Sequence, residues 1–294
     1  VIRVQGEAFA CAGDLRCIFG LHLSKTVEPL SLLRWVPDAD FLERLQDFYE
    51  SEERVLRSEI FVDEANGDPD TDAYKTRTIL EPLMKASICH AEHLNRRQAA
   101  AAVGHFVHSG PDRAETVKEF STILRKLDAS KYLEVVMATL RLWYGRWVSN
   151  RGEEDEELPD PLVLFVPLAE RLSKSIGGVG LVRTESMQQP LLKFLKAGVA
   201  FAAEGVPDKC GFFAGLVPFV KRASKQIKDR VLSHLQSVLD GMAAEDRRLL
   251  IEALEEKDPD EAALSARERD LLATFPAFLE SLGGSCESLS HPVE

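Results

Sequence analysis

This sequence has few cysteines, fewer cationic than anionic side chains and no long apolar run, and each of these features argues against a class of protein. The five cysteines are odd in number and show no Cys-x-x-Cys spacing, which argues against a disulfide framework and is typical of buried thiols in a reducing compartment. A formal net charge of −12 argues against a nucleic-acid footprint over the whole chain. No apolar stretch approaches the ~20 residues of a membrane span, and no signal peptide opens the sequence. We therefore expect no membrane span and, at most, a local contact with DNA.

A strand signal is also missing. Strict alternation of apolar and polar residues never holds for more than a few positions, whereas apolar residues recur at three- and four-residue steps from Ile2 to Leu282. This pattern predicts an all-α fold, a HEAT-like α-solenoid of antiparallel helix pairs over residues 1–282, with about six repeats of ~40–47 residues. The tail, residues 283–294, is predicted to be disordered. Because Val1 already lies in the helical pattern, we expect a fragment of a longer chain.

The helices are predicted from apolar residues that share one face. In the first helix, residues 4–23, that face carries Ala8, Ala12, Leu15 and Phe19. Further helices are predicted over residues 75–93, 96–108, 130–148, 162–176, 187–203, 211–224 and 226–242, with a last one that begins at Ser265. Acidic stretches at 63–72 and 153–157 interrupt the pattern and predict loops.

Helix ends carry local signals. Pro111-Asp112 with Glu115 three residues later predicts a helix start in which Asp112 is the N-cap, and Ser265 with Glu268 predicts a second capping box. The only glycine-rich element, residues 177–180, follows a helix and precedes no Gly-Lys-Ser/Thr. It therefore predicts a helix end and a turn, and the phosphate-loop reading fails on its context.

The side chains with metal or catalytic potential form no convincing site. The four histidines of two His-x-x-His pairs could bind zinc only if they met, and their placement about a turn near Asn95 favours histidines on a helix surface. The aspartates before Ala73 lack the glycine and closing glutamate of a calcium loop. These residues are His90, His93, His105, His108, Asp68, Asp70 and Asp72. No catalytic arrangement has a supporting motif, so we predict no enzyme, cofactor, metal or small-molecule substrate.

Two further groups of residues each allow both a purely structural interpretation and one as a nucleic-acid contact. Trp143, Tyr144 and Trp147 lie at core spacing but could also stack on bases. A basic cluster contrasts with the acidic chain and predicts either a solvated helix end or a local, weak phosphate contact, which Lys193 and Lys196 would extend. The cluster consists of Lys221, Arg222, Lys225, Lys228 and Arg230.

Several stretches, taken in order, resemble the C-terminal half of the cohesin stromal-antigen (STAG-type) subunit family. The resemblance runs from Glu7 to about Met242. A longer segment that the family has between Phe120 and Leu124 is missing from this chain. The stretches that carry the resemblance are residues 7–19, with a Glu-Ala-Phe opening and a late Ile-Phe, Pro37-Asp38, the acidic residues 63–72, Asn95-Arg96-Arg97 with Ala101-Ala102, and residues 168–172, 194–201 and 224–235.

The resemblance implies a nuclear, chromosome-associated scaffold that supports sister chromatid cohesion without being an enzyme. In that family the solenoid clamps an extended segment of the kleisin subunit and meets the ring ATPases only indirectly. The match places Asp112, Arg96 and Arg97 in the kleisin-binding region. The alternative is a HEAT-repeat transport or regulatory scaffold that binds a basic peptide, which the net charge of −12 suits equally well.

Overall fold

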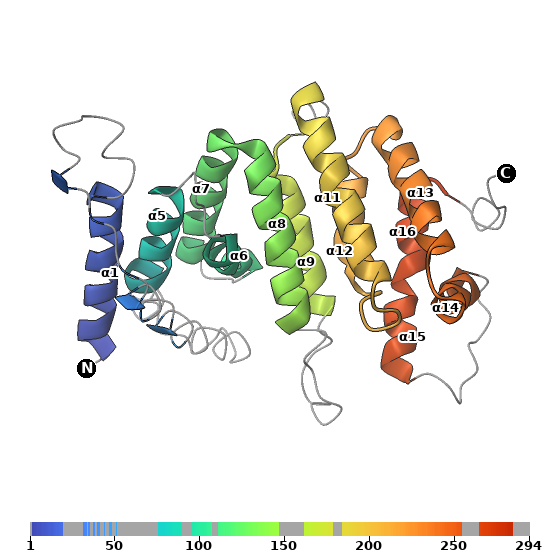
Figure 1. Cartoon of the computed structure of the whole chain (residues 1–294), viewed down its shortest axis with the longest axis horizontal. Helices are drawn as coiled ribbons and strands as arrows, with labels where there is room; N and C mark the ends of the chain where they lie inside the picture. The colour runs from blue at the N-terminus through green and yellow to red at the C-terminus, as the bar shows by residue number, and fades with distance from the viewer. Residues whose placement is uncertain are drawn as a thin grey trace. The chain divides into compact units, whose positions relative to one another are not determined.

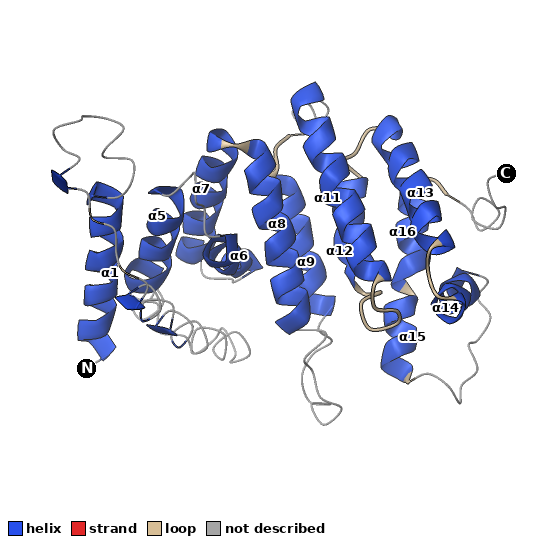
Figure 2. Cartoon of the chain, in the orientation of Figure 1, coloured by secondary structure: helices blue, strands red, loops and turns tan. Residues whose placement is uncertain are grey.

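The predicted all-α class is confirmed. The computed structural model describes a few positions between 32 and 51 and the residue ranges 2–19, 76–89, 96–107, 111–146, 162–178, 184–254 and 265–284. In these ranges the secondary structure is helical and contains no strand (Figure 2). The two acidic stretches predicted as loops, most of the tail after residue 282, and Trp147 lie outside the described residues.

The chain forms two compact units, Val1–Leu124 and Arg125–Glu294. In the first unit, α1 (Ile2–Phe19) packs on α5 (Glu81–Cys89) and on the short π-helix η3 (Thr76–Leu80), and α5 packs on α6 (Arg96–Gly104). A 3-10 turn, η5 (His105–Val107), follows α6, and α7 (Pro111–Leu127) runs across the boundary between the units.

The buried face of α1 agrees with the predicted one only in part. Phe9, Ala12 and Gly13 are buried, whereas Ala8 is exposed and Leu15 is 40% exposed. A Cβ at Gly13 would lie 2.8 Å from the Cβ of Pro82 in α5, so the glycine allows the two helices to approach closely. Small and apolar residues occur on more than one side of α1, and spacing alone therefore predicted Ala12 correctly but Ala8 and Leu15 wrongly.

The second unit is a stack of helices in two layers (Figure 1). In each layer neighbouring helices pack side by side: α8 on α11 and α11 on α13 in one, α9 on α12 and α12 on α16 in the other. The order along the chain alternates between the layers, which is the arrangement of the predicted HEAT-like α-solenoid. The bounds are α8 (Ala129–Tyr144), α9 (Leu162–Ser175), α11 (Glu185–Ala203), α12 (Phe212–Val220), α13 (Lys225–Asp240), α14 (Ala244–Leu254), α15 (Ala266–Leu272) and α16 (Thr274–Leu282).

Aromatic rings fill the space between the layers. The centroid of the Tyr144 ring lies 5.2 Å from that of Phe165 and 5.5 Å from that of Phe212, and both pairs have the edge-to-face geometry that aromatic rings prefer. The Tyr144 hydroxyl donates to the backbone carbonyl of Asp208 at 2.6 Å. Trp143 and Tyr144 are both fully buried, so the core interpretation of these two residues is confirmed.

Glycines permit the close packing of α9, α11 and α12. A Cβ at Gly198 in α11 would lie 2.6 Å from Cδ2 of Leu216, and one at Gly215 in α12 would lie 2.5 Å from Cε1 of Phe165. No Cβ fits at such distances, so these helix crossings need a residue without a side chain.

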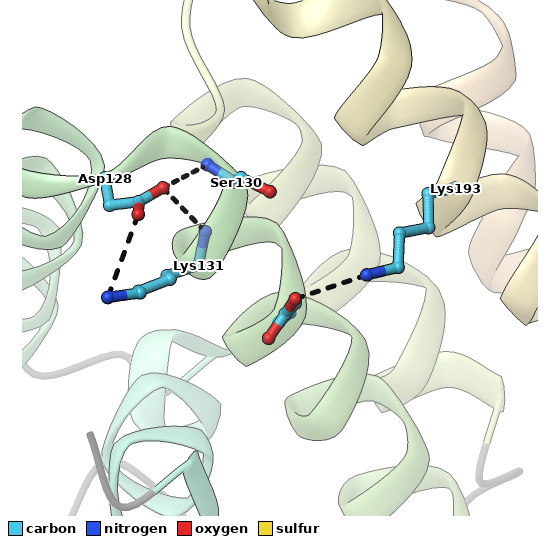
Figure 3. Close-up of polar contacts among 5 residues, drawn as sticks. Asp128, Ser130, Lys131 and Lys193 are labelled. Atoms are coloured by element: carbon cyan, nitrogen blue, oxygen red, sulfur yellow. Dashed lines mark hydrogen bonds and ion pairs between the residues drawn. The ribbon is translucent and has the colours of Figure 1, made fainter. Parts of the chain in front are cut away.

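Three helix ends have local features that cap or terminate the helix. Asp128 caps α8 by accepting hydrogen bonds from the backbone N–H groups of Ser130 and Lys131 at 2.9 and 3.0 Å (Figure 3). The capping box predicted from Ser265 and Glu268 is present at the start of α15. Gly177 follows α9 with a φ of 124°, a left-handed backbone that favours glycine.

The last predicted helix is divided in two at Ala273. Pro276 has no N–H, and its ring would clash with the carbonyl of Leu272 in a continuous helix. The Thr274 hydroxyl lies 2.8 Å from the carbonyl oxygen of Cys210 and 2.7 Å from that of Leu271, and these two acceptors share its single proton.

Candidate functional site

The basic cluster lies on the turn between α12 and α13 and on the first turns of α13. Lys221 directly follows the last residue of α12, and Ser224 is the N-cap of α13, with its hydroxyl accepting from the N–H of Ile227 at 3.4 Å. The turn therefore has a defined backbone, which sets the position from which each cationic side chain of the cluster extends.

Two of the five cations hold the fold together. Arg222 donates to the backbone carbonyl of Gly177, just after α9, and Lys228 donates to the carbonyl of Ser281 in the last turn of α16 at 2.8 Å. The last carbonyls of a helix have no partner within the helix and lie at the negative end of its dipole, so a cation satisfies them in both respects. Arg222 and Lys228 therefore contribute to the contacts between helices, and the phosphate contact at these two residues stays a prediction.

The C-terminal end of α9 makes further hydrogen bonds with side chains of α7 and α8. Arg125 in α7 donates to the carbonyl of Ser175 at 2.5 Å, and the hydroxyl of Tyr132 lies 2.5 Å from that of Ser175. Neither contact was predicted, because each joins positions that are far apart in the sequence.

The other three cations, Lys221, Lys225 and Arg230, are exposed and form no ion pair with any residue that the structure describes. They do not form one patch. Five residues of α-helix turn through about 500°, so Lys225 and Arg230 point about 140° apart. Lys221 and Lys225 remain together at the turn, and Arg230 belongs to another side of α13.

Arg230 is exposed and lies one helical turn before His234 in α13. His234 donates a hydrogen bond from its ring to the backbone carbonyl of Lys196 in α11. Lys193, which was also expected to extend the cluster, instead lies 3.5 Å from a carboxylate oxygen of Glu134 in α8 (Figure 3).

The three positions expected to bind a kleisin are only partly described. Arg96 is the first residue of α6 and is exposed, whereas the side chains of Arg97 and Asp112 lie outside the described residues. The backbone shows that α7 begins at Pro111, the helical position for which a fixed φ and a missing N–H suit proline. Asp112 is therefore the second residue of the helix, and the prediction that it is the N-cap is wrong.

The groups with metal or acid-base potential give no reactive centre in the described part of the chain. His105 is fully buried, which corrects its placement on a helix surface; His90, His93, His108 and the aspartates before Ala73 lie outside the described residues. Among the residues that the structure describes, no three His, Cys, Asp or Glu side chains are grouped to hold a metal ion.

The two described cysteines differ in their surroundings. Cys210 is buried and Cys11 is exposed, so the expectation of buried thiols holds for the first and fails for the second. Burial raises the pKa of the Cys210 thiol to about 12, and burial likewise raises the pKa of the neighbouring Tyr144 phenol. A thiol in this state is a poor nucleophile.

No known family model matches this chain, and a comparison with curated proteins gives no match. Within the described residues no helix has the length and apolarity to cross a membrane.

Proposed function

We propose that the chain is a non-enzymatic scaffold of the cohesin stromal-antigen type, which binds an extended segment of the kleisin subunit and supports the association of cohesin with chromatin. The observation that carries the proposal is the two-layered stack of helix pairs in the second unit. Such a stack presents one continuous surface made of several repeats, which suits an extended partner. The ordered resemblance of seven stretches adds the identity of that partner.

Affinity purification of the tagged chain from nuclei tests this proposal. We expect a kleisin to co-purify, with the ring ATPases in the same fraction through that kleisin. Depletion of the kleisin should remove the ATPases from the fraction, because their contact is indirect. Recovery of a transport or enzyme complex in their place would contradict the proposal and would favour the scaffold that binds a basic peptide.

We further propose a weak DNA contact at Lys221 and Lys225. Both lysines are exposed and form no ion pair among the described residues, and they lie at the two ends of the α12–α13 turn. Phosphate contacts of this kind are independent of sequence and are weakened by salt. Lys228 is left out, because its substitution would also remove the bond to Ser281.

Fluorescence anisotropy with labelled duplexes measures this contact. The double variant Lys221→Glu with Lys225→Glu should bind roughly tenfold more weakly than the parent on every duplex, with a shallower dependence on salt. The matched control, Lys85→Glu with Lys118→Glu, makes the same change in net charge at exposed ion pairs elsewhere and should bind like the parent. Equal loss in both double variants would show that only the total charge matters.

A further inference from the structure

Ser224, in the turn between α12 and α13, is flanked by cationic residues in the sequence. Lys221 and Arg222 stand three and two residues before it, and Lys225 follows it directly. Residues 209–228 contain no Asp or Glu, although the chain as a whole has a net charge of −12. Serine kinases that prefer basic substrates have acidic substrate grooves, so cations just before a serine favour its recognition and carboxylates oppose it. The sequence around Ser224 therefore has the charge pattern of a substrate for such a kinase.

The Ser224 hydroxyl is only weakly engaged. It accepts a hydrogen bond from the N–H of Ile227 at 3.4 Å, which is longer than the usual range of about 2.7–3.2 Å. Its proton has no acceptor among the residues that the structure describes. The residue is half-buried at the surface, and Lys221 and Lys225 on either side of it are exposed. The hydroxyl can therefore leave its place with the loss of one long hydrogen bond.

A kinase holds its substrate as an extended segment, so residues 221–225 must leave their turn before phosphoryl transfer. Arg222, which donates to the carbonyl of Gly177, and the buried side chain of Ala223 hold this turn in place. Turns and the first turns of helices open more readily than helix interiors do. Transfer to Ser224 therefore needs a local opening, while α12 and the rest of α13 stay packed.

We propose that Ser224 is a phosphorylation site for a serine kinase that selects basic substrates. In the transfer the Ser224 oxygen attacks the γ-phosphorus of ATP, and the bond from that phosphorus to the oxygen that bridges the β- and γ-phosphates breaks, so that ADP leaves. The hydroxyl proton passes to the catalytic aspartate of the kinase. The product carries a charge of about −1.5 to −2 at neutral pH, next to Lys225 in the sequence.

The phosphate would end the DNA contact proposed at Lys221 and Lys225, and this part of the inference rests on the proposed function. The charge of the phosphate roughly cancels that of the two lysines, and its oxygens are strong acceptors for their ammonium groups. A DNA phosphate that approaches the turn then meets a like charge. The helix start is kept, because a phosphate at the N-cap accepts from the backbone N–H groups of α13. Phosphorylation of Ser224 therefore lowers the affinity for DNA with little effect on the fold.

Mass spectrometry of the full chain after incubation with ATP and a purified kinase of this class tests the modification. We expect phosphate at Ser224 of the native protein, at least about tenfold more than at Ser265. Ser265 is a matched control, because it is also a helix N-cap, is exposed and has no cation among the four residues before it. Ser224→Asn should lose the phosphopeptide. Labelling of Ser224 that does not exceed that of Ser265, or that appears only in a sample unfolded beforehand, would overturn the inference.

Fluorescence anisotropy with a labelled duplex tests the consequence for DNA binding. Asn and Asp cap helices about as well as serine does, so Ser224→Asn and Ser224→Asp differ mainly in charge. Ser224→Asn should bind like the parent, Ser224→Asp about threefold more weakly, and the phosphorylated parent about tenfold more weakly. Equal affinity of the phosphorylated and the unmodified chain would show that the phosphate does not control the contact.

The inference and the proposed function fail separately. If the unmodified parent does not bind DNA, the proposed DNA contact is wrong, and the labelling of Ser224 against Ser265 alone decides the modification. If Lys221→Glu with Lys225→Glu weakens DNA binding but Ser224 is labelled no more than Ser265, the contact stands and the inference fails alone.

Discussion

Lys225 and Lys228 lie three residues apart in α13 and have different roles. Lys225 is exposed and makes no ion pair in the described structure, whereas the Lys228 ammonium donates to the carbonyl of Ser281. A sequence shows two lysines on one helix turn and gives no sign of this difference. The role of each cation depends on whether a helix of the other layer ends within its reach.

The first residue-scale prediction compares these two lysines. Lys228→Gln shortens the side chain and removes the charge that meets the α16 carbonyl, so it should lower the free energy of unfolding by about 1–2 kcal/mol. Lys225→Gln should change it by less than about 0.5 kcal/mol, since the side chain is exposed. Urea unfolding followed by circular dichroism measures both variants. Equal stability of the two variants would contradict the structural role of Lys228.

The second residue-scale prediction concerns thiol reactivity. With a pKa of about 12, Cys210 is a thiolate in only about one molecule in ten thousand at pH 8, and it is buried as well. An alkylating reagent should therefore label the exposed Cys11 in the native protein and label Cys210 only after unfolding. Peptide mass spectrometry after timed labelling distinguishes the two sites. Native labelling of Cys210 at the rate of Cys11 would show that the helices around it open readily.

At the scale of the helix, glycine decides how closely neighbours pack. Gly215 in α12 faces the Phe165 ring of α9, and no Cβ fits there, whereas Gly145 after α8 has nothing within 4 Å of its would-be Cβ. The two glycines look alike in the sequence. Only the packing of the layers shows that one is a helix contact and the other is an open helix end.

The element-scale prediction follows from that contrast. Gly215→Ala should lower the free energy of unfolding by about 1–3 kcal/mol, because the added methyl group pushes α12 away from Phe165. Gly145→Ala should raise it by about 0.4–1 kcal/mol, since its φ of −59° suits alanine and the unfolded chain loses freedom. Thermal unfolding of the two variants shows whether each substitution lowers or raises the free energy of unfolding. A destabilised Gly145→Ala variant would contradict the open surroundings of that residue.

At the scale of the whole molecule, the sequence was most informative where a structure depends on neighbouring residues. Helical periodicity and the absence of strand alternation predicted the all-α fold. Ser265 and Glu268 predicted their capping box because both partners lie within one turn. The candidate site was harder to predict, since its contacts join distant positions: Arg222 and Gly177 are 45 residues apart, and Lys228 and Ser281 are 53 apart. The pairing of His234 with Lys196 likewise requires knowing that α11 packs on α13, and no local pattern encodes that.

One whole-molecule prediction concerns solubility. The formal net charge of −12 and a pI of about 5.2 mean that repulsion between molecules weakens as the pH falls toward that value. We expect turbidity to be greatest near pH 5 and lower on either side. Light scattering across a pH series measures it, with the Lys85→Glu and Lys118→Glu double variant as a control whose maximum should move to lower pH. A maximum that stays fixed in this variant would indicate that aggregation follows from unfolding and not from the loss of charge.

The cations that meet helix ends also bear on the mechanics of the second unit. Arg125 and Arg222 meet the end of α9, and Lys228 meets the end of α16; all three contacts lie at the end of the stack where α13 begins. At the opposite edge, where α12 begins, the hydroxyls of Tyr144 and Thr274 donate to the carbonyls of Asp208 and Cys210. Both edges of the stack are therefore tied by polar contacts between residues far apart in the sequence. Bending of the second unit has to break such hydrogen bonds whichever edge opens.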